Sequence, residues 1–230
     1  MIPLRDSTRS EHFPIITVIL IAINTLIFYY EVSLGEEGMN QIAYIFGLVP
    51  AYYNNYQGSW LGYLPFISST FLHGSWMHLI GNMWILWLFG DNVEDKMGRV
   101  RFLSFYLLCG LIASMTHYFL NLNSGIPVVG ASGAVAGVMG AYFLMFKRAK
   151  VLTLIPPFFL FNFPAWIYLG FWAITQLYGG AAGLLTTGDE QQIAFWAHIG
   201  GFAAGMILYR VFLRPGQYGR QGGGTPVSLA

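Results

Sequence analysis

Apolar residues along this chain gather into long runs, which short polar or aromatic segments separate. A helix needs roughly 20 mainly apolar residues to cross a bilayer, and six runs come close to that length. They cover residues of about 14–30, 76–90, 102–120, 128–146, 158–177 and 193–213. The pattern predicts an all-α polytopic membrane domain over residues 1–213, built from six transmembrane helices.

Two segments do not follow this pattern. The connection at about residues 31–73 is rich in tyrosine, tryptophan and phenylalanine, so we expect it to lie in the outer headgroup layer. Residues 214–230 contain GQYGRQGGG and few apolar side chains. We expect this tail to be disordered and cytoplasmic.

Composition agrees with a membrane location and excludes other classes. Hydrophobic residues make up 56% of the 230 residues and charged residues only 9%, far below the charged share of soluble domains. The formal net charge is +1, without a basic run that could follow a phosphate backbone, so nucleic-acid binding is excluded. The single cysteine, Cys109, permits neither an intrachain disulfide nor a CxxC motif.

The cations predict the orientation. All 11 lysines and arginines lie before the first run, after an even-numbered run or in the tail. The opposite loops, at about 31–73, 121–127 and 178–192, contain none. The positive-inside rule therefore puts both termini in the cytoplasm, and we expect an integral protein of a bacterial cytoplasmic membrane.

Polar residues inside the runs are costly and so point to function. Ser132, in GASGAVAGVMG, begins the fourth run and lies 15 residues above Lys147, roughly 22 Å along a helix. His198, in FWAHIGGFAAG, is 12 residues above Arg210, roughly 18 Å. The two side chains share a depth near the outer face, where an imidazole can take the proton of a serine nucleophile.

The second run adds possible donors for an oxyanion. His78 and Asn82 in MHLIGN are four residues apart and so share a helix face, at a depth like that of Ser132. With the freed backbone N–H of Ser132, they could stabilise a tetrahedral intermediate. No Asp or Glu lies at this depth in any run, so the residues favour a Ser-His dyad over a triad.

The fourth and sixth runs also contain small residues at a spacing typical of closely packed membrane helices. Gly133 and Gly137 form one GxxxG pair, and Gly201 and Gly205 form the other. We expect these two helices to approach closely enough to bring Ser132 to His198.

These motifs resemble those of the rhomboid intramembrane serine proteases. GASG at 130–133 is similar to the nucleophile motif of the family, AHIGG at 197–201 to its histidine motif, and HGSWMHLIGN at 73–82 to its second-span motif. FGLVPA at 46–51 and GDNVEDKMGRVRF at 90–102 are also similar to family segments, and the resemblance covers about residues 10–213. Some members have an aromatic residue one turn after the serine, where this chain has Ala136.

The resemblance implies the same roles as the residues do. Ser132 would be the nucleophile, His198 the general base and acid, and His78, Asn82 and the Ser132 amide the oxyanion hole. It also implies a serine endopeptidase that needs no metal or other cofactor. Its substrates would be single-span membrane proteins, cut in the bilayer near the outer face, onto which the active site opens.

Other interpretations remain open at this stage. A catalytically silent rhomboid-like protein that binds transmembrane helices is the main alternative. A metal site formed by the outer histidines lacks a carboxylate at this depth and an HExxH motif, and a transporter would show inverted repeats. Polar residues such as Gln176 are interpreted as structural. Pro156, Pro157 and Pro164 at one end of the fifth span, and Gly179-Gly180 at the other, predict a loosely tied helix past which substrates enter.

Overall fold

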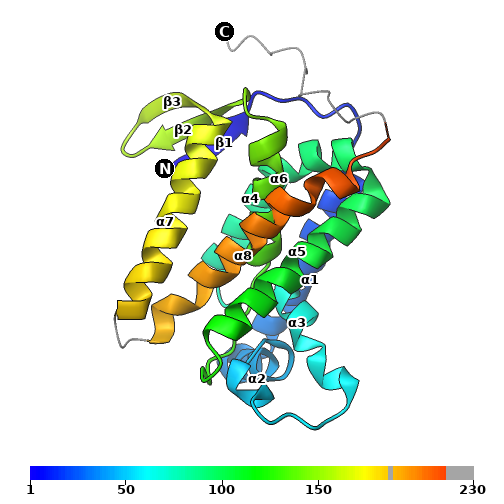
Figure 1. The fold of residues 1–230 in the computed structure, drawn as a ribbon, viewed down its shortest axis with the longest axis vertical. Coiled ribbons are helices and arrows are strands. Elements are labelled where there is room, and N and C mark those ends of the chain that lie inside the picture. Colours follow the sequence, from blue (N-terminus) through cyan, green and yellow to red (C-terminus); the bar gives the residue numbers. More distant parts are fainter. Residues whose placement is uncertain (186–188, 216–230) are drawn as a thin grey trace.

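The computed structural model describes residues 1–185 and 189–215, and each of the six apolar runs contains a helix (Figure 1). The part of the predicted tail from residue 216 on lies outside the described residues. The six long helices are α1 (Ile15–Ser33), α4 (Trp76–Met97), α5 (Arg99–Leu120), α6 (Ser132–Met145), α7 (Ala165–Leu185) and α8 (Asp189–Phe212). The core helix α6 packs against α4, α5, α7 and α8.

Three helices of the described chain are long and apolar enough to cross a bilayer by length and composition. They are α1, α5 and residues Phe195–Phe212 of α8, and α6 is apolar but shorter. The helical character of the chain is thereby confirmed, whereas the count of six spans remains a prediction. The fourth run was expected to become helical at residue 128, but its helix begins at Ser132.

Local signals explain where α4 begins and ends. Ser75 precedes it, and its Oγ accepts a hydrogen bond from the backbone N–H of His78 at 3.2 Å, as an N-cap residue does. The helix ends at Gly98, whose φ of +81° favours glycine. The chain turns there directly into α5.

Helices α6 and α8 are in backbone contact, as their GxxxG pairs predict. A Cβ atom added to Gly201 would lie 2.0 Å from the carbonyl oxygen of Gly133, and one added to Gly205 would lie 1.9 Å from that of Gly137. No side chain fits at these two positions. Glycine therefore lets the helices approach closely enough to bring the segment around His198 beside the start of α6.

A small antiparallel sheet is the main departure from the predicted all-helical fold. Its order is β1 (Ile2–Asp6), β2 (Lys150–Ile155) and β3 (Phe159–Pro164). The prediction of a fifth span from residue 158 is wrong over its first seven residues, because 159–164 pair with β2 and the helix begins only at Ala165. Pro156 and Pro157 lie between the two strands, where a missing N–H is tolerated.

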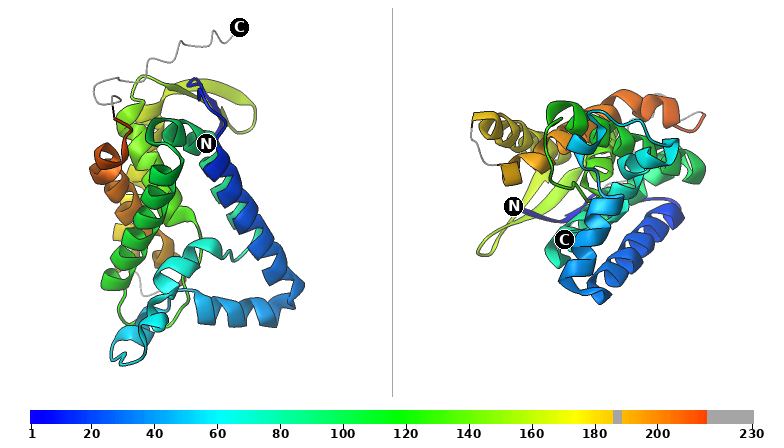
Figure 2. Two further views of the ribbon diagram at one scale, coloured as in Figure 1. Left: turned by 90° about the vertical axis from the view of Figure 1, so that its right-hand side faces the viewer. Right: turned by 90° about the horizontal axis from the view of Figure 1, so that it is seen from below.

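The long aromatic connection contains short helices rather than an open loop. These are α2 (Gly35–Phe46), η1 (Pro50–Tyr53), η2 (Trp60–Tyr63), α3 (Pro65–Ser68) and η3 (Ser69–Phe71). Figure 2 shows α2 running from the end of α1 back towards the segment that precedes α4. Rings of Tyr53, Tyr56, Tyr63 and Phe66 pack together, and Tyr118 of α5 joins them. The connection is thus fixed to the helices beside the site.

Candidate active site

Ser132 is the first residue of α6, and the loop before it is firmly held. Leu48 and Val128 exchange two backbone hydrogen bonds, of 3.0 and 2.8 Å, and the N–H of Gly130 donates to the carbonyl of Ser69 at 2.9 Å. The first backbone N–H groups of a helix have no partner within it. The N–H groups at the start of α6 are therefore suited to binding negative charge next to the Ser132 hydroxyl.

Ser132 lines a cavity of about 460 Å³. Side chains and backbone from α4, α5, α6, α8 and the loop before α6 surround it. The lining residues are Ser69, Thr70, His78, Gly110, Ala113, Ser114, Ile126, Pro127, Val128, Val129, Gly130, Ser132, Gly133, Phe195 and Ala197. Among the described residues, the lining contains the Ser132 hydroxyl and the His78 imidazole but no carboxylate and no thiol.

His78 and Ser132 meet around Gly130. A Cβ atom added to Gly130 would lie 2.6 Å from Cε1 of His78 and 3.6 Å from Oγ of Ser132. Gly130 also has a φ of +136°, which an L side chain rarely adopts. A glycine is thus required here both by the backbone conformation and by the space that the imidazole occupies.

His198 lies on α8 with its two ring nitrogens in different surroundings. Nδ1 is 2.7 Å from Oε1 of Gln176, whereas Nε2 is buried without a hydrogen-bond partner in the described protein. The neighbouring Ala197 lines the cavity of Ser132, and its carbonyl oxygen lies 3.7 Å from a Cβ atom added to Gly133. No hydrogen bond joins the Ser132 hydroxyl to Nε2 of His198 in this structure.

Asn82 lies outside the cavity, although the sequence predicts that it shares a site with His78 and Ser132. It is buried on α4, and its Nδ2 has no hydrogen-bond partner in the described protein. Unlike His78, it does not line the cavity. The structure therefore brings Ser132 and His78 to one cavity, with the donor group of Asn82 buried one helical turn below His78.

A further histidine, His73, packs against the site. It is 1% exposed, and its ring centroid lies 5.2 Å from that of His78, edge to face. Its backbone N–H donates to the Glu31 carboxylate at 3.3 Å. Burial, with a smaller effect of His78, lowers the pKa of His73 to about 3, which favours a neutral imidazole beside His78.

Sequence reasoning missed two contacts of His198, both from α7. Besides the bond to Gln176, the ring of Trp172 lies 5.9 Å from the His198 ring between centroids, at 37°. Trp172 and Gln176 are four residues apart and so face the same way. A glutamine in an apolar span was the available signal, but a helix-packing role explained it equally well.

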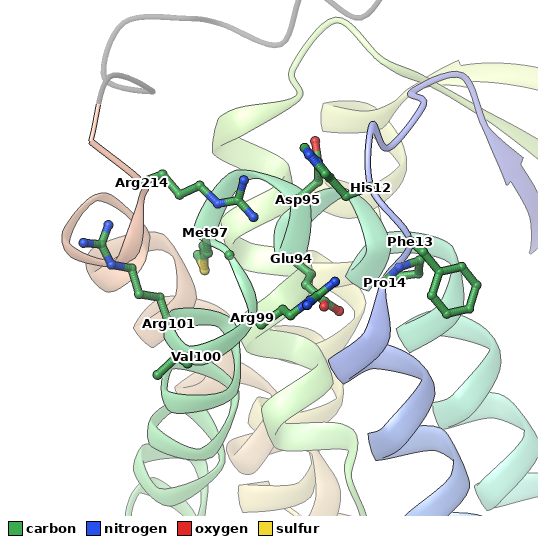
Figure 3. A pocket seen from close by; sticks show the side chains of 11 residues that line it. His12, Phe13, Pro14, Glu94, Asp95, Met97, Arg99, Val100, Arg101 and Arg214 are labelled. Carbon is green, nitrogen blue, oxygen red and sulfur yellow. The ribbon is translucent and has the colours of Figure 1, made fainter.

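Metal-ligating side chains gather elsewhere in the described residues. Glu11, His12 and Asp95 place one ligand atom each within 4.8 Å of one another. They lie at the far end of α4 from His78, where His12 Nδ1 is already 2.7 Å from Asp95 Oδ1. Figure 3 shows this region, a pocket of about 480 Å³ that Arg99, Arg101 and Arg214 also line.

Comparison with known proteins gives consistent matches. The Rhomboid domain family model matches residues 60–215. The rhomboid protease GlpG of Haemophilus influenzae is 32% identical over 192 residues, or 84% of this chain and 88% of that protein. The mitochondrial rhomboid protein 1 of Saccharomyces cerevisiae is 29% identical over 148 residues, or 63% of this chain and 40% of that protein.

Other relatives match over a shorter stretch. The mitochondrial presenilin-associated rhomboid-like protein A of Danio rerio is 33% identical over 101 residues, or 43% of this chain. That stretch is only 26% of the Danio rerio protein. The similarity to these two mitochondrial relatives therefore concerns less than half of each protein.

Proposed function

The chain belongs to the rhomboid family of integral membrane proteins, and from this premise we propose that it is an intramembrane serine protease with Ser132 and His198 as its catalytic residues. One observation carries the proposal. Ser132 lines a cavity that contains His78, while His198 presents a buried, unpartnered Nε2 on the adjoining helix. A nucleophile, a base and oxyanion donors are the groups that peptide hydrolysis requires.

Acylation uses the Ser132 hydroxyl and one nitrogen of His198, Nε2. Nε2 of His198 takes the proton of Ser132 as Oγ attacks the scissile carbonyl carbon, and the carbonyl oxygen becomes an oxyanion. The imidazolium then gives that proton to the leaving amine nitrogen as the C–N bond breaks. The products are a free amine and an ester on Ser132.

Oxyanion stabilisation falls to groups that surround Ser132. The backbone N–H at the start of α6 and the side chain of His78 border the cavity. Asn82 is the third proposed donor; its Nδ2 is buried without a partner in the described protein, one turn below His78 and outside the cavity lining. Such donors act strongly in a site with little water, because no solvent reorganises around the developing charge. Water then attacks the ester carbonyl carbon with His198 as base; the bond to Oγ breaks, the second product leaves as a carboxylic acid, and the proton on His198 returns to Ser132.

Substrates would be single-span membrane proteins cut near the outer face. The positive-inside pattern puts the cavity on that side, where water reaches a buried dyad. A transmembrane segment is helical because its backbone groups have no other partners in lipid, yet Ser132 must receive an extended peptide. Clients should therefore unwind easily at their outer end through Gly, Pro or polar residues, with small side chains beside the scissile bond.

The residues that predicted substrate entry past α7 do not leave this helix loosely held in the structure. The prolines that predicted a loose helix end belong to the β2–β3 hairpin, and the sheet ties that end of α7 to the N-terminus. At the other end, a Cβ atom added to Gly179 would lie 2.5 Å from the ring of Phe195, so this glycine permits close packing on α8. If α7 is the gate, it must move against contacts at both ends.

Cleavage of a single-span client in vesicles tests the proposal. The wild-type protein should cut a client with a Gly-Pro pair at its outer end, and the Ser132→Ala variant should not. Replacing that pair by leucines should slow cleavage, because the client helix then resists unwinding. Equal cleavage of both clients would contradict the unwinding requirement. Binding of the client without any cleavage by wild-type protein would instead favour the catalytically silent, helix-binding alternative.

A further inference from the structure

His198 is held from α7, a helix that carries none of the catalytic groups proposed above. Oε1 of Gln176 lies 2.7 Å from Nδ1 of His198, and the ring of Trp172 lies beside the imidazole. Both residues lie on the face of α7 that packs against α8. The orientation of the base therefore depends on a neighbouring helix rather than on α6 or α8 alone.

The other half of the Gln176 amide fixes which atom faces His198. Nε2 of Gln176 is 3.5 Å from the carbonyl oxygen of Trp172 and 3.2 Å from Oγ1 of Thr175. A carbonyl oxygen can only accept, so it must face the NH₂ group of the amide. Thr175 donates its own proton to the same carbonyl at 2.6 Å, which leaves its oxygen to accept. The amide oxygen of Gln176 is consequently the atom that points at His198.

The amide oxygen of Gln176 can only accept a hydrogen bond, so the atom opposite it must donate one. Nδ1 of His198 must therefore carry the proton, and in a neutral imidazole Nε2 then carries the lone pair. Nε2 is the nitrogen that is buried without a partner. We infer that Gln176 is a positioning residue that selects the His198 tautomer competent to deprotonate Ser132. This inference rests on the proposed function.

Trp172 completes the arrangement. The position one turn after Ser132 is Ala136, which is too small to support an imidazole ring, whereas Trp172 lies 5.9 Å from His198 and 5.7 Å from Phe202 between ring centroids. The aromatic surface beside the base is thus supplied from α7. Together, Gln176 fixes the tautomer and Trp172 limits the rotation of the ring.

A consequence concerns substrate entry. If α7 moves away from α8 to admit a client, Gln176 and Trp172 leave His198, and the base loses its orientation. The catalytic step should then occur only after α7 has returned. Admission and hydrolysis would be separate stages, which keeps the activated serine from acting on an open site.

Nitrogen NMR of ¹⁵N-histidine-labelled protein in detergent tests the inference without relying on activity. The His198→Ala variant identifies the His198 signals among those of the five histidines. The wild type should show a proton on Nδ1 and a bare Nε2. Gln176→Leu should give a mixture of tautomers, and Gln176→Glu should restore the wild-type pattern because a carboxyl oxygen still accepts the bond. Retention of the single Nδ1–H tautomer in Gln176→Leu would overturn the inference.

Kinetics in vesicles provide the second readout. Gln176→Leu should lower kcat by up to about a hundredfold, the cost of a misplaced catalytic group, with KM unchanged and a soluble unfolded peptide affected equally. Tyr178→Phe is the matched control, because it removes a polar group from an exposed position two residues along the same helix, and it should match the wild type. A change confined to KM would instead assign Gln176 to helix packing.

The two proposals fail differently. If the chain is not a protease, the wild type cleaves no client, although the tautomer pattern and its response to Gln176→Leu can still be observed. If only the positioning role is wrong, the wild type cleaves its client and Gln176→Leu keeps both the tautomer and the kcat.

Discussion

The polar side chains at the two ends of α4 differ in whether they have hydrogen-bond partners. At one end, which we call the charged end, Glu94, Asp95 and Asn92 are all bonded to the N-terminal segment. At the other, the cavity end, Asn82 keeps a buried nitrogen without a partner in the described protein, and so does His198 on α8. The ends are separated by the 16 residues from His78 to Glu94, or roughly 24 Å of helix.

The difference indicates which end stabilises the fold and which end reacts. A buried polar group without a hydrogen bond costs about 1–3 kcal/mol, so such groups are rare unless they serve another purpose. The polar side chains of the charged end have hydrogen-bond partners, and these bonds join the N-terminal segment to the helices. The cavity end leaves the proposed oxyanion donor Asn82 and the proposed base His198 without partners, as the proposed transition-state stabilisation requires.

Removing the base should have the largest effect on the cavity end. His198→Ala should lower client cleavage by at least about a thousandfold, since general-base and nucleophile activation are lost together. The thermal midpoint in detergent should fall only modestly, because the variant loses the single hydrogen bond from Nδ1 to Gln176 and the contact with Trp172, whereas Nε2 makes no bond in the described protein. A large drop in the midpoint would mean that His198 belongs to the structural network instead.

The charged end should respond in the opposite way. The Glu94 carboxylate accepts the backbone N–H groups of Ile16 and Thr17, at 3.0 and 2.8 Å, and the Thr17 hydroxyl at 2.9 Å. Glu94→Ala leaves these donors at the start of α1 without partners and should lower the free energy of unfolding by about 2–4 kcal/mol.

Glu94→Gln is the matched control, since it keeps one acceptor and should lose less. Both variants should retain the wild-type kcat once folded. Denaturant titration in detergent gives the stability, and cleavage by the folded fraction gives the kcat. A loss of kcat without a loss of stability would contradict the claim that the charged end stabilises the fold and takes no part in catalysis.

The oxyanion donors should have an intermediate effect. Asn82→Ala and His78→Ala should each lower kcat more than they raise KM, because their bonds strengthen only as charge develops. The double variant should lose about a hundredfold. Kinetics of a soluble unfolded peptide measure this without the entry step. An unchanged kcat in the double variant would return both residues to a packing role.

The smallest effect concerns the pH dependence of the charged end. Burial raises the pKa of Asp6 to about 7, although Tyr142 donates a hydrogen bond to its carboxylate. The native state thus binds a proton that the unfolded state releases near pH 4, so this group favours folding at low pH and less so as the pH rises to 7.

Asp6→Asn should reduce this slope between about pH 4 and 7, by under about 1 kcal/mol after solvent screening. Part of the slope should remain, because burial also raises the pKa of Asp91, to about 6. Thermal midpoints at pH 5 and 8 measure the difference, with the exposed Glu11→Gln as control. A slope in Asp6→Asn as steep as that of the wild type would assign the pH dependence to other groups.

Helix positions could be predicted because membrane helices are long and continuously apolar. The error at residues 158–164 arose because a short apolar run fits a strand as well as a helix. Pro156-Pro157 is a turn signal; it marks the turn between β2 and β3 rather than the start of the fifth span. The pairing of β2 with β1 joins residues about 150 positions apart in the chain, and no local pattern could have indicated it.

The site was predictable to the extent that burying polar groups in a membrane is costly. The depth of Ser132, His78 and His198 in the apolar runs predicts their roles, which remain proposals; in the structure, Ser132 and His78 line one cavity. The orientation of His198 was not predictable, because it depends on Gln176 and Trp172 from another helix. Contacts between helices can be identified only once the packing of the helices is known.

Labelling by a fluorophosphonate tests the central claim most directly, because the probe reacts only with a serine whose hydroxyl is activated. Wild-type protein in detergent should be labelled on Ser132. Ser132→Ala and His198→Ala should not be labelled, and Glu94→Gln should be labelled at the wild-type rate per folded molecule. Labelling that persists in Ser132→Ala, or wild-type labelling of His198→Ala, would contradict the claim that the unpartnered groups of the cavity end are the reactive ones.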